Sequence, residues 1–243
     1  MTQNPVKYVH SDDEYSNDLS CKAVVPVLME MFEPQSVVDV GCGTGNWIKN
    51  FALAGIKNYL GIDGEYVSSE KLMFDANFFL SQDLEKPITV SNTFDLVLCL
   101  EVAEHLSPGR ADTLVEDLTK LSDIVVFSAA IPSQVGQNHI NLQYPEYWIG
   151  LFSEHNFSCF DILRPLFWND LRVHWWYRQN LLVFSKRETL GTFLPSPTVQ
   201  AMISKELYEY HTDRIRHLEN RLINFRLIKS TFRRFLKSFL NAE

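Results

Sequence analysis

The first part of the chain alternates between helical and extended patterns of apolar residues. Apolar side chains recur at helical spacing over residues 17–32 and predict a helix there, which Pro34 ends. Residues 36–40 form a short β-branched run that breaks into a glycine-rich segment at 41–45, and a second helical pattern begins at Trp47. The predicted order is therefore helix, strand, glycine loop and helix.

Continuous apolar runs predict further strands. They lie at residues 58–63, 78–82, 94–100, 123–130, 157–163 and 181–185. Helical patterns separate most of them. One begins at Ser107 and Pro108, with the serine hydroxyl as its cap, and another begins at Pro145. Because the runs are almost uninterrupted in apolar character, we expect a seven-stranded α/β sheet with helices on both faces.

A compositional break follows the last predicted strand. Pro195 and Pro197 mark residues 187–198 as a linker between a domain at 1–186 and a helical tail at 199–243. The tail is predicted to form one long helix, from about 199 to 240. Its apolar residues follow steps of three and four: Ile215, Leu218, Leu222, Phe225, Phe232, Leu236 and Phe239. This spacing makes the helix amphipathic.

The charge of the chain is distributed unevenly. With 22 Lys+Arg and 30 Asp+Glu, the net charge of −8 argues against a surface that binds nucleic acid throughout. Residues 214–243 hold eight basic and two acidic side chains, or +6, which leaves −14 on residues 1–213. The basic helix can therefore form a homodimer with a second copy, lie on an anionic membrane as a peripheral contact, or dock on a partner enzyme.

Cysteine usage and hydropathy indicate the compartment. No Cys-x-x-Cys spacing occurs, and the four cysteines lie in mostly apolar or glycine-rich segments, as reduced buried thiols do: Cys21, Cys42, Cys99 and Cys159. The N-terminus lacks an apolar secretion segment, and no run approaches ~18 uninterrupted apolar residues. We expect a cytoplasmic protein that does not span a membrane, and the basic helix can place it at a membrane's inner face.

Three alternate glycines follow the first predicted strand. Gly41, Gly43 and Gly45 let the backbone turn sharply, approach a ligand closely and present amides at a helix N-terminus. A nucleoside cofactor suits such a loop, although a simple tight turn would use the same residues. A nicotinamide oxidoreductase would need Gly-x-Gly-x-x-Gly, and Asn46 stands where its last glycine belongs.

Acidic residues follow the next two strands. Asp63 lies 18 residues after Gly45, at the end of a strand, where a carboxylate can accept both ribose hydroxyls of an adenosine. Asp83 follows the third strand, where its side chain and the neighbouring backbone of Leu84 can meet an adenine amino group. Alternatively, Asp83 caps a turn.

Four segments together carry a family resemblance. They read Val-Asp-Val-Gly-Cys-Gly-Thr-Gly at 38–45, Gly-Ile-Asp at 61–63, Phe-Asp-Leu-Val at 94–97 and Leu-Glu-Val-Ala-Glu-His-Leu at 100–106. Over residues 20–186 this combination resembles the class I S-adenosylmethionine-dependent methyltransferases. The resemblance implies a Rossmann-like fold whose seven-stranded, mostly parallel sheet has an antiparallel last strand.

The resemblance also implies roles for single residues. The glycine loop would hold the methionine part of S-adenosylmethionine, and Asp39 would shape the loop from behind. Asp63 would bind the ribose, Asp83 the adenine, and Glu101 would contact the cofactor.

The candidates for removing a proton from an oxygen acceptor follow the fourth strand. Glu101, Glu104 and His105 share one face if they lie on a helical turn. Since the family places the fourth and fifth strands side by side, the loop that contains His139 should meet them. His174 is a weaker candidate.

Two carboxylates and two imidazoles would form a divalent-metal site, for Mg²⁺, Mn²⁺ or a similar ion, from Glu101, Glu104, His105 and His139. The arrangement resembles small-RNA 2′-O-methyltransferases and some ubiquinone-pathway O-methyltransferases, in which a metal binds vicinal hydroxyls. In the metal-free alternative His139 is the base, and Glu104 and His105 orient the turn.

Aromatic and basic residues suggest the acceptor. Tryptophans and a tyrosine are interleaved with basic side chains. They predict an aromatic wall that stacks on a sugar ring, with guanidiniums that bind a phosphate. The residues are Arg164, Trp168, Arg172, His174, Trp175, Trp176, Tyr177 and Arg178. These aromatics would equally cover a sheet edge or a dimer contact.

Residues 138–148 resemble a segment of surface-glycan methyltransferases. The sequence therefore predicts O-methylation of a sugar hydroxyl in a glycan or nucleotide-sugar precursor; the alternatives are an RNA 2′-hydroxyl and a non-catalytic cofactor-binding scaffold.

Overall fold

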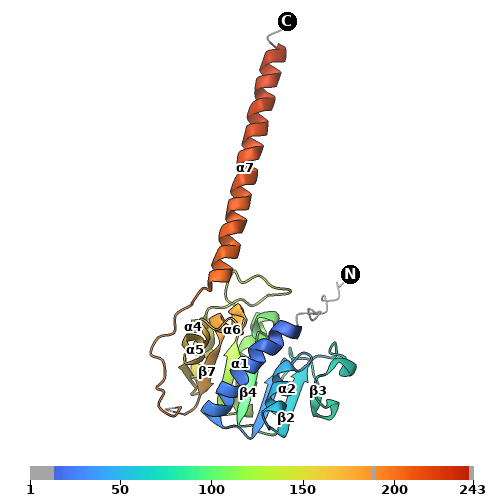
Figure 1. The fold of residues 1–243 in the computed structure, drawn as a ribbon, viewed down its shortest axis with the longest axis vertical. Helices are drawn as coiled ribbons and strands as arrows, with labels where there is room; N and C mark the ends of the chain where they lie inside the picture. Colours follow the sequence, from blue (N-terminus) through green and yellow to red (C-terminus); the bar gives the residue numbers. More distant parts are fainter. Residues whose placement is uncertain (1–13, 188–189, 241–243) are drawn as a thin grey trace. The chain divides into compact units, whose positions relative to one another are not determined.

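Within the described residues, seven strands form one sheet in the computed structural model (Figure 1). They are β1 (Ser36–Val40), β2 (Asn58–Asp63), β3 (Phe79–Ser81), β4 (Leu96–Leu100), β5 (Ile124–Ser128), β6 (Ser158–Phe160) and β7 (Leu182–Ser185). Their order is β3-β2-β1-β4-β5-β7-β6, and neighbours are parallel except that β7 is antiparallel to both β5 and β6. The predicted seven-stranded sheet with an antiparallel last strand is confirmed.

The structure describes the backbone of residues 14–187 and 190–240, and the side chains of 18–187, 190–222 and 229. The chain divides into two compact units, Met1–Met202 and Ile203–Glu243. The sheet belongs to the first unit, and helix α7 (Lys205–Leu240) makes up most of the second.

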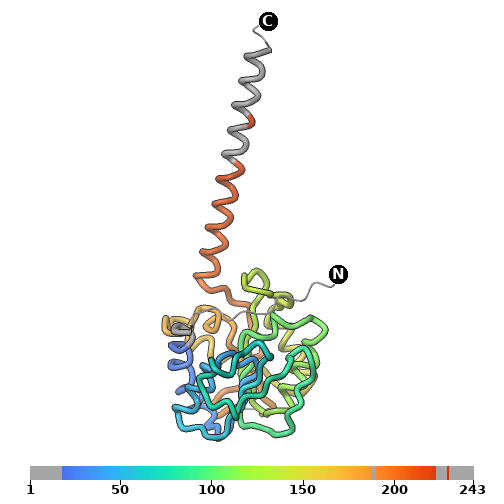
Figure 2. The backbone as a smooth tube through the Cα atoms, turned by 90° about the vertical axis from the view of Figure 1, so that its right-hand side faces the viewer, coloured from blue at the N-terminus to red at the C-terminus, as the bar shows by residue number. Residues whose placement is uncertain are grey.

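Helices cover both faces of the sheet. One face carries α1 (Glu14–Phe32), α2 (Asn46–Leu53), α5 (Leu163–Phe167) and α6 (Trp175–Asn180), and the other carries α3 (Ala111–Leu121) and α4 (Pro145–Glu154). Figure 2 shows blue α1 and the green segment that holds α3 on opposite sides of the first unit. Four 3₁₀ turns complete the described elements: η1 (Ser69–Lys71), η2 (Ala76–Phe78), η3 (Ala103–His105) and η4 (Pro108–Arg110).

The residues of β4 explain why two helical layers are needed. Leu96, Leu98 and Leu100 join the core beneath α1 and α2, whereas Val97 and Cys99 join the core beneath α3 and α4. Side chains alternate along a strand, so a strand that is apolar at every position must be covered on both faces.

Several predicted boundaries differ from the structure. The first helix starts at Glu14 rather than residue 17, and most strands are shorter than their apolar runs. Ala129 and Ala130 are buried but lie beyond the paired residues of β5, because an apolar run marks burial and not strand pairing.

The last helix also starts later than residue 199. Val199 is buried in the core, and the carbonyl of Gln200 accepts a hydrogen bond from Arg164 Nη1 at 2.9 Å. These contacts hold residues 199–200 in a non-helical path, and α7 begins at Lys205.

Two further expectations concern the cysteines and membranes. All four cysteines are buried free thiols, as predicted. No helix in the described part of the chain has the length and hydropathy needed to cross a bilayer.

Candidate functional site

A cavity of about 620 Å³ lies at the carboxyl ends of β1, β2 and β4. Segments that follow these strands line it, together with residues 83–85, 134–139 and 175–177. This is the edge at which open α/β sheets bind ligands, and the volume lies in the range of about 300–1,000 Å³ typical of small-molecule sites.

The glycine loop requires glycine at two of its positions. Gly41 has φ +83° and Gly45 has φ +90°. A Cβ on Gly41 would lie 2.2 Å from a methyl carbon of Val102, and a Cβ on Gly45 would lie 2.2 Å from the Phe74 ring. The loop can therefore pass between its neighbours and line the cavity only without side chains at these positions. Gly43 also has a positive φ, +54°.

Asp63 is buried beneath this loop and lines the cavity. Its Oδ2 accepts a hydrogen bond from the Gly43 amide at 2.7 Å. Its Oδ1 accepts hydrogen bonds from the Gly64 amide, at 2.7 Å, and from the Tyr66 hydroxyl. The protein thus holds the carboxylate rigidly against the glycine loop. Sequence reasoning did not identify Tyr66, because a lone tyrosine in a loop carries no motif.

Asp39 is the fourth residue of β1, is buried and lines the cavity; its role in shaping the loop stays a prediction. Among the described residues its Oδ2 has no hydrogen-bond partner, and the same holds for the buried Oδ1 of Asn46. Burial raises the pKa of Asp39 from 3.8 to about 8, and the neighbouring charge of Asp63 adds to this effect. Both residues line the cavity.

Asp83 and Leu84 reach the cavity on a short loop after β3. The Asp83 carboxylate accepts the Glu85 amide at 3.1 Å and pairs with Lys86, so it caps a turn as the alternative interpretation predicted. The Leu84 carbonyl accepts a hydrogen bond from Arg110 Nε at 2.8 Å. The adenine-binding roles of Asp83 and Leu84 stay predictions.

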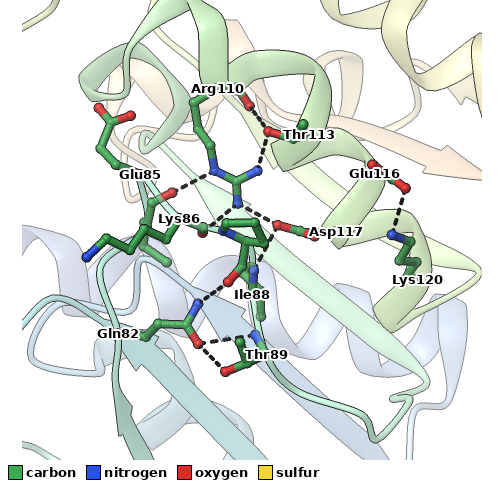
Figure 3. A network of polar contacts seen from close by, with 12 residues as sticks. Gln82, Glu85, Lys86, Ile88, Thr89, Arg110, Thr113, Glu116, Asp117 and Lys120 are labelled. Atoms are coloured by element: carbon green, nitrogen blue, oxygen red, sulfur yellow. Dashed lines mark hydrogen bonds and ion pairs between the residues drawn. The ribbon is translucent and has the colours of Figure 1, made fainter.

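Arg110 fastens this loop to α3 (Figure 3). Its buried guanidinium also donates to the Lys86 carbonyl, at 3.0 Å, and to Asp117 Oδ2, at 2.5 Å. Asp117 Oδ2 in turn accepts the Ile88 amide at 2.9 Å. Sequence reasoning missed this network because its members lie on separate elements and share no periodic pattern.

Ser107 makes a second connection between the two segments, and its predicted capping role is wrong. Its amide and hydroxyl both donate to the Glu85 carboxylate, each at 2.8 Å, and its side chain makes no capping bond. The acidic partner competes successfully for the hydroxyl because a charged acceptor forms the stronger hydrogen bond. The contact joins the loop after β3 to the turn after β4.

Glu101 follows β4 in a left-handed conformation, with φ +56°. Its amide donates to the Ser128 carbonyl at 2.9 Å, and its carboxylate accepts from the side-chain amides of Gln134, at 3.1 Å, and Asn180, at 3.2 Å. The predicted helical turn from 101 to 105 is wrong, because only Ala103–His105 forms a 3₁₀ turn. Neither amide partner has a sequence signature.

Three of the four predicted metal ligands converge. Within the described residues, ligand atoms of Glu104, His105 and His139 all lie within 4.8 Å of one another. The His105 and His139 rings meet edge to face with centroids 4.9 Å apart. Glu101 is not a member of this group, although its side chain interacts with that of Glu104.

The loop after β5 meets the turn after β4, as predicted. The amides of Ile140 and Asn141 donate to the Glu104 carbonyl at 2.8 and 3.0 Å. His139 Nδ1 lies 2.9 Å from the Gln134 carbonyl oxygen. Because a carbonyl oxygen can only accept a hydrogen bond, Nδ1 carries the proton, and Nε2 keeps a free lone pair that can accept a proton or bind a metal.

The electrostatics of this cluster favour neutral forms of its side chains. Burial raises the pKa of Glu104 well above its ordinary value, and the charge of Glu101 adds to the effect. Burial also raises the pKa of Glu101 and lowers that of His139. Neither Glu104 oxygen makes a hydrogen bond of normal geometry within the described residues. A buried carboxyl that lies beside the Glu101 carboxyl and two imidazoles suits a cation or a shared proton.

Three aromatic residues of the predicted wall line the cavity: Trp175, Trp176 and Tyr177. His174 stacks on Trp176, with ring centroids 3.8 Å apart. Three of the four predicted aromatic residues therefore share the cavity with the acids and histidines, whereas Trp168 is not among its lining residues.

The predicted phosphate role of the nearby arginines is wrong for Arg164, which is buried. Arg164 is 1% exposed and pairs with Asp161 at 2.5 Å, and Arg172 pairs with Asp170 at 2.6 Å. Arg178 donates to the Trp168 carbonyl at 3.0 Å. The buried Arg164 therefore stabilises the fold, whereas the side chain of Arg172 is exposed and its phosphate role stays a prediction.

Comparison with known proteins now identifies this arrangement. Residues 14–120 match the family model of a methyltransferase domain. The solved structure of magnesium protoporphyrin IX methyltransferase from Synechocystis, with bound SAH, covers 76% of this chain and 90% of its own at 18% identity and a TM-score of 0.52. Residues 14–120 carry a methyltransferase domain, and the first unit has the fold of class I S-adenosylmethionine-dependent methyltransferases. The predicted enzyme class and cofactor are confirmed, and the family model gives no support to the oxidoreductase alternative.

Two other solved structures share the methyltransferase fold. The sugar N-methyltransferase KedS8 from a Streptoalloteichus species has 13% identity and a TM-score of 0.56, and covers 77% of this chain and 100% of its own. DesVI from Streptomyces venezuelae has 12% identity and a TM-score of 0.54, with coverages of 74% and 100%. Identities this low show the fold alone. No curated protein matches the sequence.

The residues of the cavity fit S-adenosylmethionine. The cofactor carries a sulfonium and an ammonium, and the unpaired buried oxygens of Asp39 and Asn46 are acceptors without a donor. Asp63 offers a carboxylate for ribose hydroxyls, and the glycine loop leaves room for close approach. When bound, the cofactor supplies an electrophilic methyl group on sulfur.

Proposed function

We propose that this methyltransferase acts on a hydroxyl oxygen of a sugar, in a glycan or nucleotide-sugar precursor. The observation that carries the proposal is the convergence of Glu104, His105 and His139 beside an aromatic wall in the cofactor cavity. Apolar aromatic faces suit a sugar ring, and the histidine suits a hydroxyl that must lose its proton.

In this proposal His139 removes the proton of the acceptor hydroxyl. The Gln134 carbonyl holds the proton of Nδ1, so the lone pair of Nε2 remains available. Partial burial lowers the pKa of His139, which keeps the ring neutral near pH 7. The acceptor oxygen forms its bond to the methyl carbon as the carbon–sulfur bond breaks, the electron pair stays on sulfur, and the proton moves to His139. The walls of the cavity hold the acceptor in line.

We also propose that Glu104, His105 and His139 can hold a divalent cation such as Mg²⁺ or Mn²⁺. The mixed oxygen and nitrogen donor set and the buried carboxyl of Glu104 support this site. A bound cation would lower the pKa of a hydroxyl that it contacts. With the cation present, His139 would be a ligand, so the two roles of this histidine exclude each other.

Transfer of a labelled methyl group tests the acceptor. The purified enzyme is supplied with labelled S-adenosylmethionine and neutral sugars, nucleotide sugars, amino sugars or RNA. We expect label on a sugar oxygen and a loss of about 100-fold or more in kcat for His139→Ala. His155→Ala is the matched control, since His155 ends α4 and is not among the residues that line the cavity. Label found on amines or RNA instead would overturn the proposed acceptor.

Chelation and calorimetry test the cation. If the cation is required, excess EDTA abolishes activity, Mn²⁺ restores it, and Glu104→Gln removes the calorimetric signal of Mn²⁺ binding. The exposed Glu116→Gln variant should keep that signal. A full rate in EDTA, with His139→Ala still inactive, would assign the histidine to proton transfer.

We propose that the C-terminal helix supplies a contact with a second copy or with an anionic membrane. Ile215, Leu218 and Leu222 are 55%, 48% and 58% exposed, so three residues of the predicted apolar seam are open to solvent. The remaining seam positions lie outside the described side chains: Phe225, Phe232, Leu236 and Phe239. The excess of basic residues after position 213 favours an anionic partner.

A further inference from the structure

Asp63 has fewer free acceptor positions than the cofactor ribose requires. A carboxylate offers about four lone-pair sites. Hydrogen bonds from Gly43, Gly64 and Tyr66 already occupy three of these sites on Asp63. A ribose whose two hydroxyls both donate to Asp63 needs two sites. Five donors exceed the capacity of the carboxylate, so at least one present donor must leave when the ribose binds in this way.

The Tyr66 hydroxyl is the donor that can leave. The Gly43 amide belongs to the glycine loop, and the Gly64 amide directly follows Asp63, so the backbone holds both in place. Tyr66 is a side chain that lines the cavity and is 36% exposed. Rotation of its side chain breaks the contact without any change in the backbone.

Gly64 makes the present position of Tyr66 possible. A Cβ at residue 64 would lie 2.3 Å from the Tyr66 ring, so the ring rests directly against the glycine backbone. This packing aims the hydroxyl at Asp63 Oδ1, the oxygen that also accepts the Gly64 amide.

We propose that the Tyr66 hydroxyl competes with the ribose of the cofactor for Asp63 and thereby sets the affinity of the enzyme for nucleoside ligands. The inference goes beyond the proposed acceptor and rests on cofactor binding alone. Every ligand that needs both Asp63 contacts must first displace this hydroxyl. The apparent dissociation constant of such a ligand equals its intrinsic value divided by the fraction of molecules in which Tyr66 has moved away, so a small fraction weakens binding.

Calorimetry on the full-length protein tests this competition. Tyr66→Phe keeps the ring and removes the competing hydroxyl. A hydrogen bond to a charged acceptor contributes enough that its loss is expected to tighten binding of S-adenosylmethionine and its demethylated product by about tenfold each. The matched control is Tyr144→Phe, which alters an exposed tyrosine that is not among the cavity-lining residues and should leave both affinities unchanged.

A second pair of ligands isolates the ribose. In Tyr66→Phe, adenosine should gain affinity as the cofactor does, whereas 2′,3′-dideoxyadenosine should not, because it has no hydroxyls for Asp63. Unchanged or weaker binding of S-adenosylmethionine in Tyr66→Phe would overturn the proposal, as would equal gains for both nucleosides. Absence of binding by the unaltered enzyme would instead count against the cofactor site itself.

Discussion

At the scale of single residues, the site depends on glycines without a Cβ and on carboxyl groups that are buried. The glycine loop lines the cavity because Gly41 has no Cβ to meet Val102. Behind it, Asp39 is buried without a partner for its Oδ2 among the described residues, which raises its pKa to about 8. Such an arrangement costs stability and leaves an acceptor available for a cationic ligand.

The buried Asp39 predicts a specific dependence of stability on pH. Its folded pKa of about 8 lies above its ordinary value of 3.8, so the folded state retains a proton that the unfolded state loses. Its contribution to the free energy of unfolding is fully present below pH 3.8 and is lost as the pH rises through about 8. Asp39→Asn cannot ionise, so its stability should fall less steeply over this interval.

Urea unfolding of both proteins at several pH values between 4 and 8 measures this difference. Glu101 and Glu104 have pKa values raised in the same direction, so the slope should decrease in Asp39→Asn and not vanish. Parallel pH dependences of the two proteins would show that Asp39 is ionised in the folded state at all these pH values.

At the scale of elements, the loop after β3 is held by contacts with α3 and not by its own regular structure. Arg110 binds the carbonyls of Leu84 and Lys86 and pairs with Asp117, and Gln82 bonds to Thr89 within the loop (Figure 3). The position of this cavity wall is therefore set by a helix that follows it in the chain.

Arg110→Met tests this dependence. The substitution leaves Asp117 buried without its ion-pair partner and two carbonyls without their donor. We expect the free energy of unfolding to fall by about 3–5 kcal/mol and the dissociation constant of S-adenosylmethionine to rise. Chemical denaturation and calorimetry measure the two effects.

Lys120→Met is the control on the same helix, because it breaks only the exposed ion pair with Glu116. It should change neither stability nor cofactor affinity measurably. If Arg110→Met lowered the stability but left the cofactor affinity unaltered, the Arg110 network would stabilise the fold without positioning the cofactor site.

At the scale of the whole molecule, the division of the chain predicts separable roles. The cavity and the sheet lie within Met1–Met202, and α7 belongs to Ile203–Glu243. A chain that ends at Met202 should bind S-adenosylmethionine as the full chain does, but should lose any self-association or membrane binding that α7 provides.

Three measurements on the two chains check this prediction. Calorimetry compares cofactor affinity, light scattering compares molar mass, and flotation with anionic vesicles compares membrane binding. If the full-length protein is monomeric and does not float with anionic vesicles, the helix binds neither a second copy nor a membrane, and both proposals are wrong. A shortened chain that no longer binds the cofactor would show that the units are not independent.

Much of the fold follows from short-range patterns. The strand bounds at Ser36–Val40 and Asn58–Asp63 match the apolar runs, and the three glycines fall where the backbone has positive φ. Local conformation dictates these features, because a strand buried on both faces needs continuous apolar residues and a left-handed turn needs glycine. The family resemblance added the strand order and the cofactor.

The sequence by itself thus determined the fold class, the glycine loop and the acids that follow the strands. Only the tertiary structure placed Tyr66 on Asp63, Arg110 beneath Leu84, and Gln134 on Glu101. It also showed that the group of candidate metal ligands consists of Glu104, His105 and His139, without Glu101. The physical reason is that periodicity and turn chemistry act over a few residues, whereas a hydrogen bond between distant segments depends on how whole elements pack, which no local pattern encodes.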